Sequence, residues 1–159
     1  MKSDLAAIHC AFCAGNPRDV YEAFGQGYKR AFRSGRFSHA YVEFQDTADS
    51  ADLQIYLSGA IAAATDLPEV PMQSQELGGE EGLWGVELMS EAWVQAVAAI
   101  PDDKIETVRD FLVDQCQKDC GRLTEGWQVN TLSNELRGLV TLARQSVSER
   151  GPLMLLWEL

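Results

Sequence analysis

The sequence of 159 residues lacks the long apolar runs that membrane-spanning proteins require. No stretch reaches about 18 uncharged apolar residues, which excludes a transmembrane helix. The first ten residues carry one lysine and no extended apolar segment, so they do not match a secretory signal. We therefore expect a cytoplasmic protein whose four cysteines stay reduced, because the cytosol keeps thiols out of disulfides.

The sequence also lacks the short motifs of common catalytic and nucleotide-binding sites. It has no Gly-x-Ser-x-Gly elbow, no His-Glu-x-x-His helix, no Walker loop and no Rossmann glycine fingerprint. The glycine-rich segment LGGEEG at 77–82 is acidic and would repel a phosphate. We therefore name no catalytic residue. A small-molecule enzyme with a pocket near His39 and residues 66–82 is kept as an alternative, without a reaction assigned to it.

Positive charge is scarce, above all in the middle of the chain. The formal net charge is −11, from 13 Lys and Arg against 24 Asp and Glu. Residues 46–119 hold sixteen acidic and three basic residues, whereas residues 1–45 hold four acidic and six basic ones. Nucleic acids and anionic membranes are bound mainly through Lys and Arg, so this balance argues against both as partners. It favours a basic protein partner, although an acidic surface also simply keeps a protein soluble.

Apolar spacing and capping residues predict five or six helices. Asn16 and Pro17 are typical of a helix start, as are Ser90-Glu91 and Pro101-Asp102. The helices are expected between Ser3 and Gly15, from Pro17 to Gly35, over 51–65, after Ser90, from Pro101 to Gly121, and through Leu132 to Val147. For residues 53–57, a strand is the alternative.

Three segments have strand patterns. Residues 39–45 alternate polar and apolar side chains, residues 83–88 (LWGVEL) are apolar, and residues 153–158 belong to a continuous apolar run typical of a buried or central strand. The polar segment 66–82, with its prolines and glycines, predicts a flexible acidic loop. The expected fold is a single α+β domain over 1–159, with five or six helices packed on a small mixed sheet.

The four cysteines form two pairs at helical spacing, Cys10 with Cys13 and Cys116 with Cys120. Four thiolates would complete a tetrahedral zinc site, which makes a structural zinc or thiol protein one alternative. The other interpretation is four buried core residues, because cysteine is among the residues most often buried. A redox role is disfavoured, since the first pair would lie at the end of a predicted helix, where the helix dipole opposes a thiolate. We expect no cofactor, with zinc as the exception to test.

Two segments carry a resemblance to other proteins. They are LGGEEGLWGVELMSEAWVQAVAAI at 77–100 and LRGLVTLARQSVSERGPLMLLWEL at 136–159. They resemble the middle and the end of small acidic bacterial proteins of unknown function, some of which act as immunity proteins. The resemblance implies an α+β fold and brings no catalytic residues.

The function expected from these features is that of a non-enzymatic interaction module that binds a basic partner through an acidic face. The candidate partner-binding residues are Glu80, Glu81, Asp102, Asp103 and Trp127. Trp127 is included because it lies in a predicted loop, where an exposed aromatic side chain can anchor an interface. A homodimer stays open, because the apolar C-terminal strand would pair with a second copy if it lay at a sheet edge.

Overall fold

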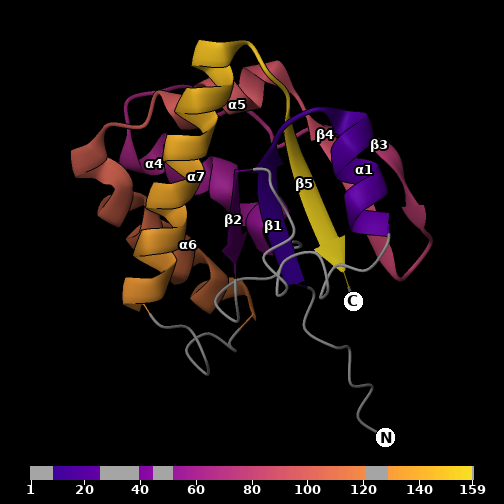
Figure 1. Ribbon diagram of the computed structural model, residues 1–159. Coiled ribbons are helices and arrows are strands. Elements are labelled where there is room, and N and C mark those ends of the chain that lie inside the picture. Colours follow the sequence, from indigo (N-terminus) through magenta and orange to yellow (C-terminus); the bar gives the residue numbers. More distant parts are fainter. Residues whose placement is uncertain (1–8, 26–39, 45–51, 121–128, 159) are drawn as a thin grey trace, which may run out of the picture.

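The computed structural model describes residues 9–25, 40–44, 52–120 and 129–158 (Figure 1). They form one five-stranded sheet with helices on both faces. The strands are β1 (His9–Ala14), β2 (Tyr41–Phe44), β3 (Ser74–Glu80), β4 (Trp84–Met89) and β5 (Leu153–Glu158). Their order across the sheet is β2-β1-β5-β4-β3. All four pairings are antiparallel, so the α+β prediction is confirmed but the described sheet is not mixed.

The C-terminal strand β5 is the centre of the sheet, as its continuous apolar run predicts. It pairs with β1 on one side and with β4 on the other. Leu153, Met154, Leu155 and Leu156 are all buried. The expectation of a homodimer through this strand required β5 to lie at a sheet edge. Both edges of β5 are instead paired within the sheet.

The expected helix between Ser3 and Gly15 is wrong where the structure describes it, because residues 9–14 form strand β1. β1 pairs with β5 and β2, so its backbone groups are satisfied on both sides by segments distant in sequence. Short apolar runs fit the period of a helix and of a strand alike. Here the non-local pairing decided between them.

The thicker helical layer covers one face of the sheet. It contains η1 (Leu53–Leu57), α4 (Ser58–Ala64), α5 (Glu91–Ala98), η2 (Asp102–Lys104), α6 (Ile105–Cys120) and α7 (Val129–Glu149). The helices predicted over 51–65, after Ser90, from Pro101 and before Gly151 are confirmed. With α1 they make five α-helices in the described chain. None of its helices is both long and apolar enough to span a membrane.

Trp93 of α5 lies at the centre of this layer. Its ring stacks on Phe12 of β1 with centroids 5.7 Å apart, and its indole Nε1 donates to Ser58 Oγ at 3.2 Å. The helix that carries it begins where Ser90 Oγ accepts a hydrogen bond from the backbone N–H of Trp93. The predicted Ser90 cap therefore orients the largest side chain of the core.

In the described chain, the opposite face is covered by a single helix, α1 (Pro17–Gly25). Asn16 caps it as expected, because its Oδ1 accepts from the backbone N–H groups of Arg18 and Asp19 at 3.0 and 3.2 Å. The rest of the helix predicted to reach Gly35 lies outside the described residues. The ring of Phe24 packs edge-on against Trp84 of β4, with centroids 5.5 Å apart. Helix α1 therefore packs against the β3–β4 hairpin.

The predicted loop at 66–82 is shorter in the structure. Residues 66–73 contain no helix or strand, but Ser74–Glu80 form β3, which pairs with β4. The register shifts between Glu76 and Gly78, which makes Leu77 the extra residue of a β-bulge. The sequence pattern did not indicate a strand at β3, because glutamate and glycine are depleted in strands.

Candidate interaction surface

The cysteines do not gather into one site. Successive residues of a strand point to opposite faces, and accordingly Cys10 belongs to the core under the thick helical layer and Cys13 to the core under α1. Cys116 is buried on α6, and the side chain of Cys120 lies outside the described residues. The described chain holds no group of three or more His, Cys, Asp or Glu side chains arranged to bind a metal. With its thiols on opposite faces, the Cys10–Cys13 pair does not present two ligands to a single ion.

Cys13 is also poorly suited to redox chemistry. The side chain is fully buried and its Sγ lies 3.5 Å from the carbonyl oxygen of Ala14, to which it donates. Burial raises the pKa of the Cys13 thiol to about 12, because the charged thiolate would lose its hydration. The thiol is therefore neutral at ordinary pH, whereas thiol–disulfide exchange requires the thiolate.

The predicted partner-binding residues lie in two separate places. Glu80 ends β3 and Glu81 lies in the turn that follows; both are exposed. Asp102 and Asp103 form the start of η2, between α5 and α6. Glu80 faces Trp84, at the end of the sheet that is far from the turn between α7 and β5. Glu80 and Glu81 therefore do not form one face with Asp102 and Asp103. Trp127 lies outside the described residues.

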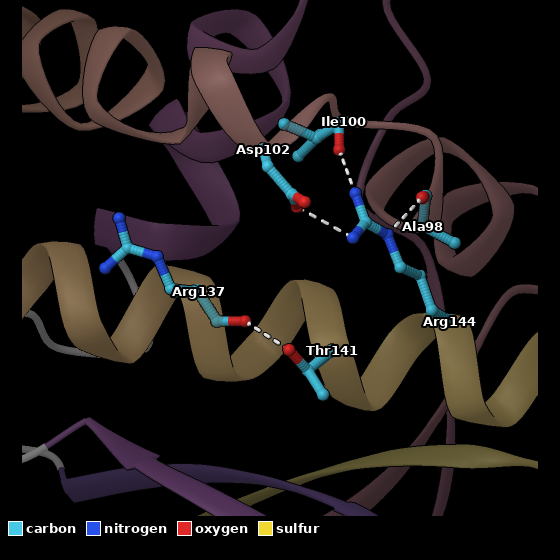
Figure 2. Close-up of polar contacts among 6 residues, drawn as sticks. All are labelled: Ala98, Ile100, Asp102, Arg137, Thr141 and Arg144. Carbon is cyan, nitrogen blue, oxygen red and sulfur yellow. Dashed lines mark hydrogen bonds and ion pairs between the residues drawn. The ribbon is translucent and has the colours of Figure 1, made fainter.

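Asp102 is part of a structural contact that the sequence analysis missed (Figure 2). Arg144 of α7 donates from Nη1 to Asp102 Oδ1 at 2.8 Å. Its Nε donates to the carbonyl oxygen of Ala98 at 3.1 Å, and Nη2 donates to that of Ile100 at 2.6 Å. Arg144 thereby satisfies carbonyl groups at the end of α5 and neutralises Asp102. No local pattern reveals this contact, because Arg144 and Asp102 are 42 residues apart in the chain.

The exposed face of α6 is the first of two acidic surfaces. Its carboxylates Glu106, Asp110 and Asp114 lie opposite the buried stripe that includes Ile105 and Leu112. Asp103, in the preceding η2, adjoins them. Two of them have ion pairs within the helix, Asp110 with Arg109 and Asp114 with Lys118, both at 2.8 Å. The hydrogen bond with Asp114 raises the pKa of Lys118, so that the ammonium stays charged. This surface is therefore partly neutralised by its own helix.

The β3–β4 hairpin is the second acidic surface, and its charges are not compensated in the same way. Its carboxylates are Glu76, Glu80, Glu81 and Glu87. The sequence has no lysine or arginine between Arg36 and Lys104. Within the described residues none of these carboxylates has an ion pair, and Glu87 accepts only from the Ser74 hydroxyl, at 2.7 Å. The hairpin is therefore the stronger source of negative potential in the described structure.

Two exposed leucines lie among these acids. Leu77, the bulge residue, is 37% exposed, and Leu83 of the β3–β4 turn is 52% exposed. Neither leucine belongs to either of the two hydrophobic cores. Exposed apolar side chains surrounded by charge are typical of an interface. We define the acidic hairpin surface as Glu76, Leu77, Glu80, Glu81 and Leu83.

A groove adjoins the first residues of β3. Its volume is about 960 Å³, and its walls come from the start of β3, the start of α5 and the end of α7. Arg150, which ends α7 with a positive φ of 52°, lines it together with Glu91. The groove therefore carries one positive and one negative side chain, and its charge does not favour a ligand of either sign.

The chain was compared with protein-family models, with curated proteins and with solved structures, and none matched. The functional interpretation therefore rests on the geometry and charge of the residues themselves.

Proposed function

We propose that the protein is a non-enzymatic interaction module that binds a basic protein partner through the acidic hairpin surface. The observation that carries the proposal is the cluster of carboxylates on β3 and β4, which has no ion pair within the described chain. Cationic groups on a partner would form the ion pairs that the hairpin carboxylates lack within the described chain. Attraction of this kind speeds encounter and selects partners by charge.

The exposed leucines support a protein partner over a small cation. Leu77 and Leu83 place apolar area beside the carboxylates, and interfaces combine a desolvated apolar centre with charged groups at the rim. The resemblance to small acidic bacterial proteins agrees with this function. An immunity protein that neutralises a basic toxin acts through the same charge complementarity. The proposed interface contains Glu80 and Glu81 and does not contain Asp102, which forms an ion pair with Arg144.

The test uses a fluorescent peptide of repeating Lys-Lys-Val-Val sequence as a defined basic probe, because its extended form carries lysines on both faces. One variant carries Glu76→Gln, Glu80→Gln and Glu81→Gln. The matched control carries Glu106→Gln, Asp110→Asn and Asp114→Asn on α6, and therefore loses the same formal charge. Binding is measured by fluorescence anisotropy over a series of salt concentrations.

We expect the hairpin variant to weaken binding by roughly 0.6–3 kcal/mol, because each exposed charge pair contributes roughly 0.2–1 kcal/mol. The α6 variant should bind nearly as the natural protein does, and affinity should fall as salt rises. Equal weakening by the two variants would show that only net charge matters. Binding insensitive to salt, or no binding at all, would overturn the proposed function.

A further inference from the structure

Strand β3 forms one edge of the described sheet. β3 pairs with β4 alone, and β4 separates it from β5. Six of its seven residues are exposed, and no segment within the described residues covers its length. An edge strand presents backbone N–H and C=O groups that have no partner in the sheet, and another extended chain can pair with them.

We propose that the basic partner binds by adding a strand to the free edge of β3. This inference rests on the proposed function of the same surface and specifies how the partner is held. The partner segment is an extended, lysine- or arginine-rich strand with cationic side chains on both of its faces. Its backbone pairs with β3, while the cations of one face meet Glu76 on the side of the thick helical layer and those of the other face meet Glu80 on the α1 side. Charge complementarity selects this occupant among all the chains that could pair with an edge.

The charges also disfavour pairing of β3 with a second copy of itself. Residues 74–80 contain no lysine and no proline, two of the residues that commonly protect sheet edges. They contain glutamates instead, at 76 and 80. Two such edges brought together would set these carboxylates against each other, and like charges across a strand pair are destabilising. The edge therefore repels a copy of itself and attracts a basic strand.

The edge is held in an extended form before any partner arrives. Tyr21 of α1 lies so close to Gly78 that a Cβ at this glycine would come within 2.6 Å of the ring. A Cβ at Gly79 would come within 2.3 Å of the backbone oxygen of Trp84. At these two glycines β3 therefore lies against α1 and β4 with no room for a side chain. A rigid edge loses less conformational entropy on binding than a loop would.

The decisive test alters the backbone of the probe and leaves its charge unchanged. Three peptides have the same repeating Lys-Lys-Val-Val sequence, which places lysines on both faces of an extended chain. The first is unmodified, the second is N-methylated along one edge of its extended form, and the third along both edges. Alternate N–H groups of an extended chain point to opposite edges, so the second peptide can still pair with β3 through its free edge, whereas the third cannot.

Strand addition predicts that the first two peptides bind with similar affinity and that the third binds more than tenfold more weakly. Hydrogen exchange on the full chain should show new protection of β3 amides with the first peptide and none with the third. If all three bind equally, and binding still depends on Glu76, Glu80 and Glu81, strand addition is wrong and the proposed function stands. If none binds, the proposed function fails as well.

Discussion

Glu76 and Glu87 lie directly opposite each other on β3 and β4. Facing residues of an antiparallel pair interact across about 4.5–5.5 Å between their Cβ atoms. Ser74 donates to Glu87, but no described lysine or arginine forms an ion pair with either carboxylate. Among the described residues, this pair of like charges therefore has no compensating cation, at the surface proposed to bind a partner.

The first prediction is that Glu76→Gln stabilises the isolated protein. Removing one of two facing charges should raise the free energy of unfolding by roughly 0.2–1 kcal/mol, measured by urea denaturation. Glu80→Gln is the control, because Glu80 faces Trp84 and has no facing like charge. Glu76→Gln should at the same time weaken binding of the basic probe. A loss of stability in Glu76→Gln would show that the carboxylate has a favourable contact in solution.

Arg144→Ala should destabilise the fold by about 1.5–3 kcal/mol. The substitution removes a charged donor from the carbonyl groups of Ala98 and Ile100 and ends the ion pair with Asp102. Arg137→Ala is the control on the same helix, since the exposed Arg137 side chain hydrogen-bonds only Asn134 among the described residues, at 3.4 Å. The bond from Thr141 goes to the Arg137 backbone carbonyl, which the substitution keeps. Thermal or urea denaturation of both variants gives the comparison. Similar stability of the two variants would show that the Arg144 contacts contribute little.

Gly79→Ala should destabilise the protein by at least about 2 kcal/mol. Gly79 has a φ of 153°, and its new Cβ would meet the backbone of Trp84 at 2.3 Å and of Gly85 at 2.7 Å. Backbone atoms cannot rotate away as a flexible side chain can. Gly151→Ala is the control, because a Cβ there meets nothing within 4 Å and its effect should stay within about 0.5 kcal/mol. Urea denaturation measures both, and a well-tolerated Gly79→Ala would contradict the tight β3–β4 packing.

Burial of Cys13 predicts a loss of stability in alkaline solution. The pKa of this thiol is about 12 in the folded protein against 9.0 for the unperturbed group, because burial penalises the thiolate. The stabilisation is therefore complete below pH 9. It is lost as pH rises toward 12, where the unfolded chain releases this proton and the folded chain does not. The slope should approach about 1.4 kcal/mol per pH unit.

Cys13→Ala isolates this effect. The variant lacks the ionisable thiol, so its unfolding free energy should fall less steeply than that of the natural protein between pH 8 and about 10.5. Urea denaturation at each pH gives both curves. Parallel curves would show that Cys13 is accessible to water in solution.

Most helices were predictable because their signals are local. Asn16 and Ser90 accept hydrogen bonds from the first turns of α1 and α5, and a cap of this kind needs only the residues next to it. The long helix α7 has an apolar stripe and ends just before Gly151, as its pattern predicts. The apolar run of β5 likewise indicated a central strand.

The proposed interaction surface was only partly predictable from the sequence. The acidic composition of residues 46–119 identified Glu80 and Glu81, but it did not separate them from Asp102. That aspartate lies elsewhere in the fold and is neutralised by Arg144. The facing arrangement of Glu76 and Glu87 depends on strand register, which composition does not contain.

The amino-acid sequence by itself determined the starts of the capped helices α1 and α5, the central strand and the excess of negative charge, because each depends on neighbouring residues or on a sum over the chain. Only the tertiary structure decided that residues 9–14 are a strand and that 74–80 form a sheet edge. A strand is stabilised by hydrogen bonds to segments far away in sequence. The same pairing put Cys10 and Cys13 on opposite faces and left one edge of β3 unpaired among the described strands.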